Sequence, residues 1–308
     1  MKKVFIDGSA GTTGLRIYER LSGRDDLSLI LLSEENRKDP NARKDAILEA
    51  DIAFLCLPDD AAREAVALAE GADTCIIDTS TAHRTAEGWT YGFPEIGNLR
   101  EQIKVSKRIA NPGCHASGFI ALVKPLTELG VLTKDAFISC FSLTGYSGGG
   151  KKMIAEYEGE EKNILLNSPR QYGLSQQHKH LPEMTKICGL KKPPAFCPVV
   201  ADYYSGMEVT VTLFKEQLNG NLNEIITVYK DYYKNGTVKY VDSSDENGFL
   251  AANSISGFDS MEISAFGNDE RILLVSRFDN LGKGASGAAI QNMNIVLGAD
   301  EAAGLNIK

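Results

Sequence analysis

The chain has 308 residues, of which 43% are hydrophobic and 24% charged, a balance typical of a folded globular protein. Its formal net charge of −8 at pH 7 argues against nucleic acid as the main partner, and no apolar run is long enough to cross a bilayer. The chain starts without an apolar signal segment, and its six cysteines include no C-x-x-C pair. We therefore expect a cytoplasmic protein with reduced thiols, no bound metal and no membrane partner.

The first hundred residues alternate short apolar runs with helix-compatible segments. Short strands that are apolar on both sides and separated by helices indicate a parallel sheet with helices on both faces. The sequence therefore predicts an α/β domain over residues 1–115. The expected strands are residues 4–7, 27–32, 52–57 and 75–78, and the expected helices are residues 15–21, 42–50 and 61–69.

After about residue 115 the pattern changes. Residues 116–129 have an apolar face at helical spacing, with Pro125 expected to kink the helix. The later strands alternate apolar and polar residues, which is typical of a mixed or antiparallel sheet with one open face. This predicts a second, α+β domain over residues 116–282. Its expected strands are residues 136–142, 207–213, 262–265 and 271–278, and a last helix is expected at residues 285–297.

A glycine-rich turn follows the first strand and opens the first helix. Residues 8–14 have a G-x-x-G-x-x-G spacing, a variant of the dinucleotide-binding fingerprint. Glycines let the backbone approach a pyrophosphate, and the helix N-terminus supplies N–H donors and a favourable field. The alternative is a tight turn that binds nothing. The candidate cofactor-binding residues in this turn are Gly8, Ser9, Gly11, Thr12, Thr13 and Gly14.

The preference between NAD and NADP depends on the residues after the second strand. An acidic residue about twenty positions after the fingerprint favours NAD, and Glu34 and Glu35 lie near that place. However, Ser33 directly follows the strand, and Arg37 and Lys38 come soon after. A hydroxyl and nearby cations suit a 2′-phosphate, whereas the plain alternative is a solvated charged loop. The residues favour NADP only slightly.

The segment Asn111-Pro112-Gly113-Cys114 opens the helix of the second domain. Gly113 allows a sharp turn, and Cys114 then stands at or next to the helix start, where unpaired N–H groups stabilise a thiolate. Such a thiolate is an activated nucleophile, whereas the alternative is a buried thiol that only packs. Together with a bound nicotinamide, a thiolate at this helix start predicts one reaction class. An activated acyl group passes to the sulfur as a thioester, and hydride then reduces the thioester to an aldehyde.

The proton transfers of that reaction need a general acid/base, most often a histidine. His115 is a poor partner for Cys114 because consecutive helix positions point apart. If the run around His178 and His180 is extended, both side chains face the same way. We favour His180, with Glu183 as an orienting carboxylate, and a surface loop is the alternative. A metal site made of His178, His180, Cys188 and Cys197 would fit no common zinc spacing.

Two further glycine-rich segments are candidates for binding. Residues 144–151 follow a strand, and successive backbone N–H groups there can form an anion nest to which Lys151 or Lys152 adds charge. This nest suits a phosphate leaving group, and a flexible hairpin or lid is the alternative. Residues 280–288 precede the last helix. They form either a second helix-start site, with Asn280 and Gly284 at the cofactor, or a loop that packs closely.

Together these segments resemble the N-acetyl-gamma-glutamyl-phosphate reductase family, in its shorter (type 2) form. The Asn-Pro-Gly-Cys and His-x-Pro-Glu pieces are specific to this family and its relatives, the aspartate-semialdehyde dehydrogenases. The chain departs from the larger members at His115-Ala116-Ser117, where they have an aromatic residue, a small residue and Thr. Lys151 also stands where many relatives have Arg, and both departures fit the shorter form. The matching stretches are residues 8–14, 91–96, 111–114, 144–151, 178–183 and 280–286.

The resemblance implies NADPH-dependent reduction of N-acetyl-glutamyl phosphate to the semialdehyde in arginine biosynthesis, with Cys114 as nucleophile and His180 as acid/base. It implies a Rossmann domain that the C-terminal helix, about residues 283–308, completes, and an α+β domain that builds a homodimer or homotetramer. Two rival hypotheses stay open. One is the same chemistry on aspartyl phosphate or a carrier-linked aminoadipyl phosphate, and the other is a non-catalytic, NADP-sensing Rossmann protein. The candidates for substrate binding are Asn111, Ser147, Gly148, Lys151, His178 and Glu183.

Overall fold

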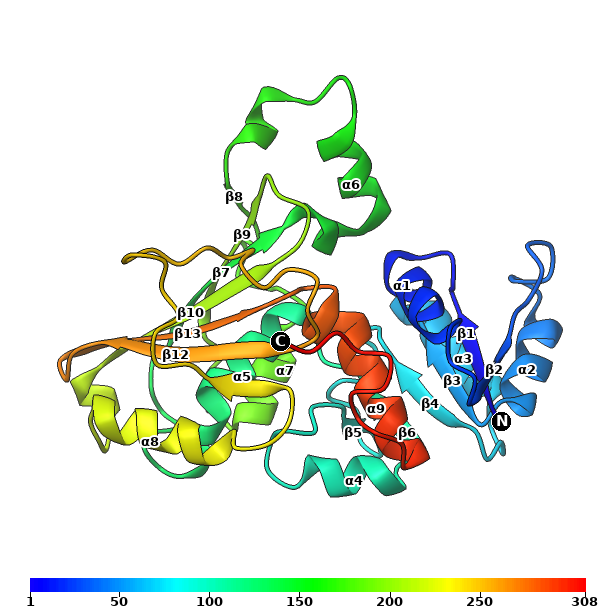
Figure 1. The fold of residues 1–308 in the computed structure, drawn as a ribbon, viewed down its shortest axis with the longest axis horizontal. Helices are drawn as coiled ribbons and strands as arrows, with labels where there is room; N and C mark the ends of the chain where they lie inside the picture. The colour runs from blue at the N-terminus through cyan, green and yellow to red at the C-terminus, as the bar shows by residue number, and fades with distance from the viewer. The chain divides into compact units, whose positions relative to one another are not determined.

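The computed structural model describes residues 1–308 and divides into two compact units. Figure 1 shows their helices and strands, coloured in chain order. The two predicted domains differ from these units at their edges, because two short segments near residues 95 and 306 belong to the second unit. Unit 1 comprises Met1–Pro94, Asn98–Pro112 and Ala285–Leu305, and unit 2 comprises Glu95–Gly97, Gly113–Gly284 and Asn306–Lys308.

Six parallel strands form the sheet of unit 1 in the order β2-β1-β3-β4-β6-β5. The chain runs from β1 to β2 on one side and then crosses back to β3 on the other side of β1. In open α/β sheets, ligands bind beyond the carboxyl ends of the strands at such a reversal. The strands are β1 (Lys2–Asp7), β2 (Leu27–Ile30), β3 (Ile52–Leu55), β4 (Cys75–Asp78), β5 (Thr90–Tyr91) and β6 (Arg108–Ala110).

Helices cover both faces of this sheet. Val4 packs in one core with Ile17 and Met293, whereas the next residue, Phe5, packs in a second core with Ile47. Because successive strand residues point to opposite faces, the two cores lie on the two sides of the sheet. This confirms the predicted α/β fold. The helices of unit 1 are α1 (Thr12–Leu21), α2 (Pro40–Glu49), α3 (Asp59–Leu68), α4 (Leu99–Val105) and α9 (Gly287–Leu297).

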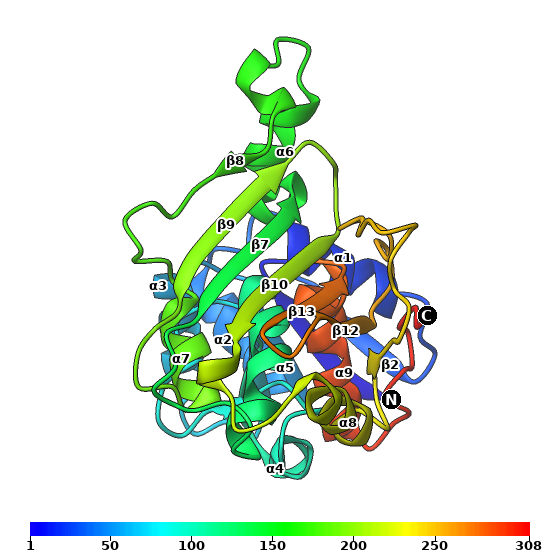
Figure 2. The same cartoon turned by 90° about the vertical axis from the view of Figure 1, so that its left-hand side faces the viewer.

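Unit 2 contains a mixed sheet of seven strands in the order β11-β12-β13-β10-β7-β9-β8. The pairs β7–β9 and β11–β12 are parallel, and the other four pairs are antiparallel. Figure 2 shows β9, β7, β10, β13 and β12 side by side in this order. The strands are β7 (Ser139–Gly145), β8 (Arg170–Gln171), β9 (Ala195–Ala201), β10 (Met207–Phe214), β11 (Val238–Tyr240), β12 (Met261–Gly267) and β13 (Arg271–Phe278).

One face of the mixed sheet is covered by helices. Along β10, Val209 and Val211 are buried whereas Thr210 and Thr212 are half-buried, the alternation expected for a sheet with one covered face. The long helix α5 (Cys114–Glu128) packs closely on β10 and β13. The closeness is clear at Gly118, where an added Cβ atom would lie only 2.5 Å from Val209. The helices of unit 2 are α5 (Cys114–Glu128), α6 (Gly150–Glu158), α7 (Leu181–Cys188) and α8 (Leu222–Tyr232).

The structure corrects two local predictions. The glycine-rich segment 144–151 is not a loop or hairpin, because it forms a 3₁₀ turn, Tyr146–Gly149, that leads into α6. The run from His178 to His180 is not extended. The N–H of Leu181 donates to the carbonyl of His178, and His180 has helical dihedral angles at the start of α7. None of the helices combines the length and the hydropathy that a membrane crossing would need.

Candidate active site

Cys114 is the first residue of α5, a helix of 15 residues whose N-terminal cap is Gly113. Its side chain is half-buried and therefore accessible to a small molecule, whereas Cys75, Cys140 and Cys188 are buried. Burial raises the pKa of Cys75 to about 12, which keeps that thiol protonated and inert. Cys114 differs from these buried thiols by its access to solvent and by its place at a helix N-terminus, the position that stabilises a thiolate.

Three histidines form a cluster in the same unit. The ring centroids of His178 and His180 are 4.7 Å apart, and each lies within 5.7 Å of the ring of His115. The two rings of the loop come together through the turn before α7, in which the N–H of His180 donates to Nδ1 of His178. The extended backbone considered from the sequence is therefore not present, although the two rings do lie on the same side. His115, the second residue of α5, completes the cluster.

His115 cannot act as a base near neutral pH. Its side chain is only 3% exposed, and this burial, with the nearby charges of His178 and Lys179, lowers its pKa to about 3. Both of its ring nitrogens lie 2.6 Å from hydroxyl groups, Nδ1 from Ser142 and Nε2 from Tyr172. His115 is therefore a neutral imidazole with a hydroxyl partner at each ring nitrogen, which leaves His178 and His180 as the candidates for a general acid/base.

Glu183 fixes the start of α5. This carboxylate is buried in the first turn of α7 and accepts a hydrogen bond from the backbone N–H of Gly113 at 3.2 Å. The helices α5 and α7 pack against each other along this contact. Glu183 was predicted from sequence to orient a histidine, which stays a prediction. The contact in the structure adds that it holds the backbone immediately before the candidate nucleophile.

The loop before α9 also reaches this site. Gly284 lies in a single π-helical turn, Gly282–Ser286, and a Cβ atom there would stand 3.0 Å from Cβ of Cys114. Gly284 therefore packs directly on Cys114, which favours the close-packing alternative for this loop. Nearby, Lys283 and Glu95 form a buried ion pair at 2.8 Å that fixes the turn.

The candidate phosphate-binding residues lie at the start of α6. Ser147 is buried and accepts a hydrogen bond from the amide of Asn280 at 3.0 Å, while Asn280 accepts one from the N–H of Gly206. Gly148 and Lys151 are exposed in front of and within the first turn of α6. The sequence assigned Asn280 to the cofactor and Ser147 to the substrate, and the structure joins the two residues within unit 2. Both assignments stay predictions.

The glycine turn of unit 1 forms a cradle between β1 and α1. Gly8 has φ +86°, and a Cβ atom on it or on Gly14 would clash with neighbouring backbone. Thr12 and Thr13 begin α1, whose first turn has neither a side-chain cap nor an acidic residue. The first N–H groups of the helix are therefore not capped by a carboxylate or hydroxyl. These features fit a pyrophosphate, because only glycine allows the close approach and the helix start attracts an anion.

The loop after β2 is exposed from Ser33 onward. Arg37 forms an ion pair with Glu34 at 3.0 Å, so this loop presents both an acidic and a basic side chain. At the end of β1, buried Asp7 is paired with Arg43 of α2 at 2.9 Å. Burial raises the pKa of Asp7 in spite of this cation. The structure thus leaves the NAD or NADP preference as the sequence left it.

Asn111 lies inside unit 1, with its side chain 1% exposed. Its amide donates to the carbonyl of Ala285 at 3.0 Å and accepts from Asn292 of α9. These contacts tie the end of β6 to the returning C-terminal segment. Asn111 therefore stabilises the packing of β6 against the C-terminal segment, and its predicted contact with substrate stays a prediction.

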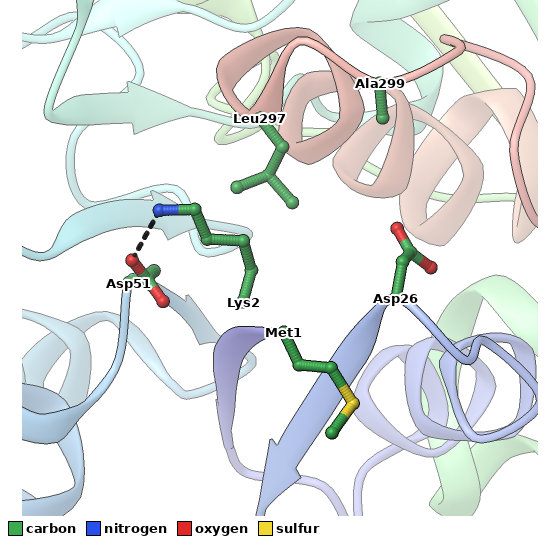
Figure 3. Close-up of a pocket in the computed structure, with 6 residues that line it drawn as sticks. All are labelled: Met1, Lys2, Asp26, Asp51, Leu297 and Ala299. Atoms are coloured by element: carbon green, nitrogen blue, oxygen red, sulfur yellow. Dashed lines mark hydrogen bonds and ion pairs between the residues drawn. The ribbon is translucent and has the colours of Figure 1, made fainter.

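Figure 3 shows the residues that line a surface hollow in unit 1. It is lined at the start of β1 by Met1 and Lys2, and Lys2 donates to Asp51 at 2.9 Å. The starts of parallel strands lie at the edge opposite their carboxyl ends, so this hollow is not the dinucleotide cradle. No group of three or more His, Cys, Asp or Glu side chains is arranged to hold a metal ion.

Sequence reasoning missed three contributors to the site around Cys114. His115 was set aside, and Tyr172 and Ser142 were not considered, because both are distant from Cys114 in sequence. Gly284 was predicted to bind the cofactor, and its contact with Cys114 was not foreseen. One signal for His115 was available. The larger family members have an aromatic residue directly after the cysteine, and His115 occupies that position in this chain.

Two family models match the chain. "Semialdehyde dehydrogenase, NAD binding domain" matches residues 3–106, and "Semialdehyde dehydrogenase, dimerisation domain" matches residues 114–280. The chain is 44% identical over 318 residues to the "N-acetyl-gamma-glutamyl-phosphate reductase 2" of Nostoc sp., a match that covers 98% of this chain and 99% of the relative. It is 45% identical over 307 residues to the reductase of that name from Brucella anthropi, covering 96% and 98%.

Solved structures resemble the whole chain as well. Aspartate semialdehyde dehydrogenase II of Vibrio cholerae, complexed with ASA, has a TM-score of 0.73 at 17% identity and covers 96% of this chain and 98% of its own. The aspartate semialdehyde dehydrogenase of Candida albicans with NADP has a TM-score of 0.70 at 16% identity, covering 97% and 99%. At such low identity these matches establish the shared fold.

Proposed function

The chain belongs to the semialdehyde dehydrogenase family and is an oxidoreductase that uses a nicotinamide cofactor; on this premise we propose that it reduces N-acetyl-L-glutamyl 5-phosphate to the semialdehyde, a step of arginine biosynthesis. The relatives whose names state this reaction are 43–45% identical to the chain over nearly its full length. The observation that carries the proposal is the half-buried thiol of Cys114 at a helix start, beside a cluster of three histidines.

In the first step, Cys114 attacks the acyl carbon of the substrate. His180 takes the proton of the thiol, the S–C bond forms, and the C–O bond to phosphate breaks with its electron pair leaving on phosphate. The product is an acyl thioester on Cys114. His178, whose Nδ1 accepts the N–H of His180, binds the substrate beside it.

The leaving phosphate is bound at the start of α6. The hydroxyl of Ser147 and the charge of Lys151 suit a phosphate that gains negative charge as it leaves. The backbone N–H groups of Tyr146 and Ser147 do not take part, because they donate to the carbonyls of Tyr203 and Tyr204. Asn280 donates to Ser147 and so orients its hydroxyl.

The cofactor is held by the cradle of unit 1. Gly8, Gly11 and Gly14 allow the pyrophosphate to approach the backbone, and the first N–H groups of α1 bind it. When bound, the nicotinamide supplies the hydride that reduces the thioester. The proton that His180 removed then returns to the Cys114 sulfur when the aldehyde leaves. We propose NADP as the cofactor, because Ser33 and Arg37 suit a 2′-phosphate.

We propose that two copies of the chain associate through the open face of the mixed sheet. The register of the strands places Phe141 opposite Thr210 and Leu273 opposite Thr212 on this face, and Phe141 and Leu273 are 46% and 42% exposed. Exposed apolar side chains that gather on one face are typical of a protein interface. The family model for this part of the chain is described as a dimerisation domain. Either a homodimer or a homotetramer would contain this contact.

The experiment that tests the reaction is a rate comparison. The purified protein receives N-acetylglutamyl phosphate, aspartyl phosphate or a carrier-linked aminoadipyl phosphate, each with NADPH or NADH, and the aldehyde is trapped and identified. We expect the N-acetyl substrate with NADPH to give the highest kcat/KM. Faster reduction of another acyl phosphate would reassign the substrate. Tight NADPH binding with no reduction of any of them would support a sensing protein instead.

A further inference from the structure

We propose that His115 is a positioning residue that aims the hydroxyl hydrogen of Tyr172 at the acyl group carried by Cys114. The inference rests on the proposed function, because it assigns a donor to the oxygen of that acyl group. Three side chains from three elements form the chain of contacts: Ser142 on β7, His115 on α5, and Tyr172 directly after β8.

The geometry of this chain is complete at the imidazole. Nδ1 of His115 lies 2.6 Å from Oγ of Ser142, and Nε2 lies 2.6 Å from the hydroxyl oxygen of Tyr172. His115 is 3% exposed and Ser142 is fully buried. The ring is therefore held between two hydroxyls and cannot turn without losing both hydrogen bonds, of which the one to Ser142 is buried. A neutral ring carries one hydrogen, so one of its contacts must be accepted and the other donated.

Hydrogen-bond accounting fixes the direction of the chain. Ser142 is buried and its hydroxyl has His115 as its partner, so its hydrogen goes to Nδ1. The reverse direction would leave that hydrogen without an acceptor in the interior, at about 1–3 kcal/mol. The hydrogen of the imidazole then stands on Nε2 and donates to the oxygen of Tyr172. The hydrogen of Tyr172 itself is left for a further acceptor.

Tyr172 contacts His115, which directly follows Cys114 on α5, so its hydroxyl lies near the helix start that carries the candidate nucleophile. Tyr172 is half-buried, and the charge of Cys114, after the larger effect of burial, raises its pKa. The hydroxyl thus stays protonated at neutral pH. Its ring is packed against those of His115 and His178, and its backbone N–H donates to Pro198 of β9 at 3.0 Å. The donor is therefore held on a rigid support.

A fixed O–H donor beside the acyl group would stabilise the charge that develops on its oxygen. When the thioester is formed and reduced, negative charge develops on the oxygen of the acyl group. A preorganised donor stabilises that oxygen more in the transition state than in the ground state. Tyr172 would contact the reacting group, whereas His115 and Ser142 would act only through it.

The test compares Tyr172→Phe, His115→Phe and the double variant, by kcat, KM and NADPH affinity. Loss of one such donor typically lowers kcat by about 10²-fold. We expect that loss in each single variant, with KM and NADPH affinity little changed, and no further loss in the double variant. Additive losses would contradict the shared path through Tyr172. Wild-type kcat in Tyr172→Phe would overturn the proposal.

Two further variants separate positioning from folding. His115→Gln keeps an uncharged N–H donor near the position of Nε2, and we expect it to recover part of the kcat that His115→Phe loses. Ser142→Ala removes the group that fixes the tautomer, and we expect a loss smaller than that of Tyr172→Phe. Equal kcat in the Gln and Phe variants would mean that His115 only fills space.

A matched control is Tyr232→Phe. Tyr232 lies on α8, and its hydroxyl also makes two hydrogen bonds, with the N–H of Gly97 and with Glu128. It should keep the wild-type kcat. The wild type is assayed first, because an inactive wild type refutes the proposed function, whereas an active wild type with an unimpaired Tyr172→Phe refutes only this inference.

Discussion

The two candidate sites of this chain are built in different ways. In unit 1 the dinucleotide cradle comes from one continuous segment, Gly8 to Gly14, between a strand and a helix. In unit 2 the surroundings of Cys114 come from distant places in the chain, among them Gly284 and Glu183. A contiguous site depends on a few backbone angles, whereas an assembled site depends on the packing of the whole unit. The two sites should therefore respond separately, and in different ways, to substitution.

The largest separation should come from Cys114→Ser. An alkoxide is far less accessible than a thiolate, so we expect kcat to fall by several orders of magnitude while NADPH still binds to unit 1. The measurements are steady-state turnover and NADPH fluorescence titration. Cys197→Ser, which changes another half-buried thiol on the mixed sheet, is the control and should stay active. Substantial activity in Cys114→Ser would rule out covalent catalysis through this residue.

The next effect concerns His180. Removing a general acid/base typically lowers the rate by about 10²–10⁴-fold. We expect a loss in this range for His180→Asn, with a small effect on NADPH affinity and an altered pH–rate profile. His178→Asn is measured beside it. If His178→Asn changes the profile and His180→Asn does not, the acid/base role belongs to His178.

A substitution in unit 1 should give the converse result. Gly8→Ala forces a side chain into a backbone with φ +86° and against the carbonyl of Cys56. We expect weaker NADPH binding and a loss of about 1–3 kcal/mol in the free energy of unfolding. Acylation of Cys114, measured by mass, should persist. Gly23→Ala, with no atom within 4 Å of the added Cβ, is the control. Unchanged NADPH affinity in Gly8→Ala would argue against a nucleotide at this turn.

The buried imidazole of unit 2 should appear in the pH dependence of stability. The pKa of His115 is about 3 in the folded chain and 6.5 in the unfolded one. Between these values the unfolded chain binds a proton that the folded chain does not. Above about pH 6.5, His115 does not change the free energy of unfolding. As the pH falls from about 6.5 to about 3, His115 lowers the free energy of unfolding by about 1.4 kcal/mol per pH unit. Denaturant titrations of wild type and His115→Gln measure this slope, and equal slopes would contradict it.

The smallest effect is expected for Gly284→Ala. The added Cβ would stand 3.0 Å from Cβ of Cys114 and must shift the nucleophile by a few tenths of an ångström. We expect a several-fold loss in kcat with unchanged NADPH affinity, because small misplacements of a nucleophile slow the chemical step. The matched control is Gly23→Ala, because Gly23, like Gly284, has ordinary backbone angles. Gly130→Ala would not serve as a control, because Gly130 has a positive φ. A wild-type kcat would show that the contact is tolerated.

The same contrast explains what could be predicted from sequence. The fold class and the glycine turn follow from local patterns, and the strand–turn–helix of unit 1 lies where the apolar runs placed it. The segment 144–151 was predicted as a glycine-rich loop, yet it forms a 3₁₀ turn and Gly150 begins α6, although glycine disfavours helices. The partners of His115 depend on β7, β8 and β9 coming together, which no spacing in the sequence encodes.

The position of His178 beside His180 was predicted for a wrong reason. An extended run would also put both side chains on one side, but a turn before α7 produces the contact. Pro182 in the first turn of that helix was the available signal, since proline favours the start of a helix. Helix starts therefore explain more of this site than strand alternation does.

The most direct measurement of the central claim is the mass of the protein after mixing with N-acetylglutamyl phosphate without cofactor. The account predicts that wild type gains one N-acetylglutamyl group on the peptide that contains Cys114, and that Cys114→Ser gains none. Production of the semialdehyde in the presence of NADPH, with no such adduct on Cys114 in its absence, would contradict the account.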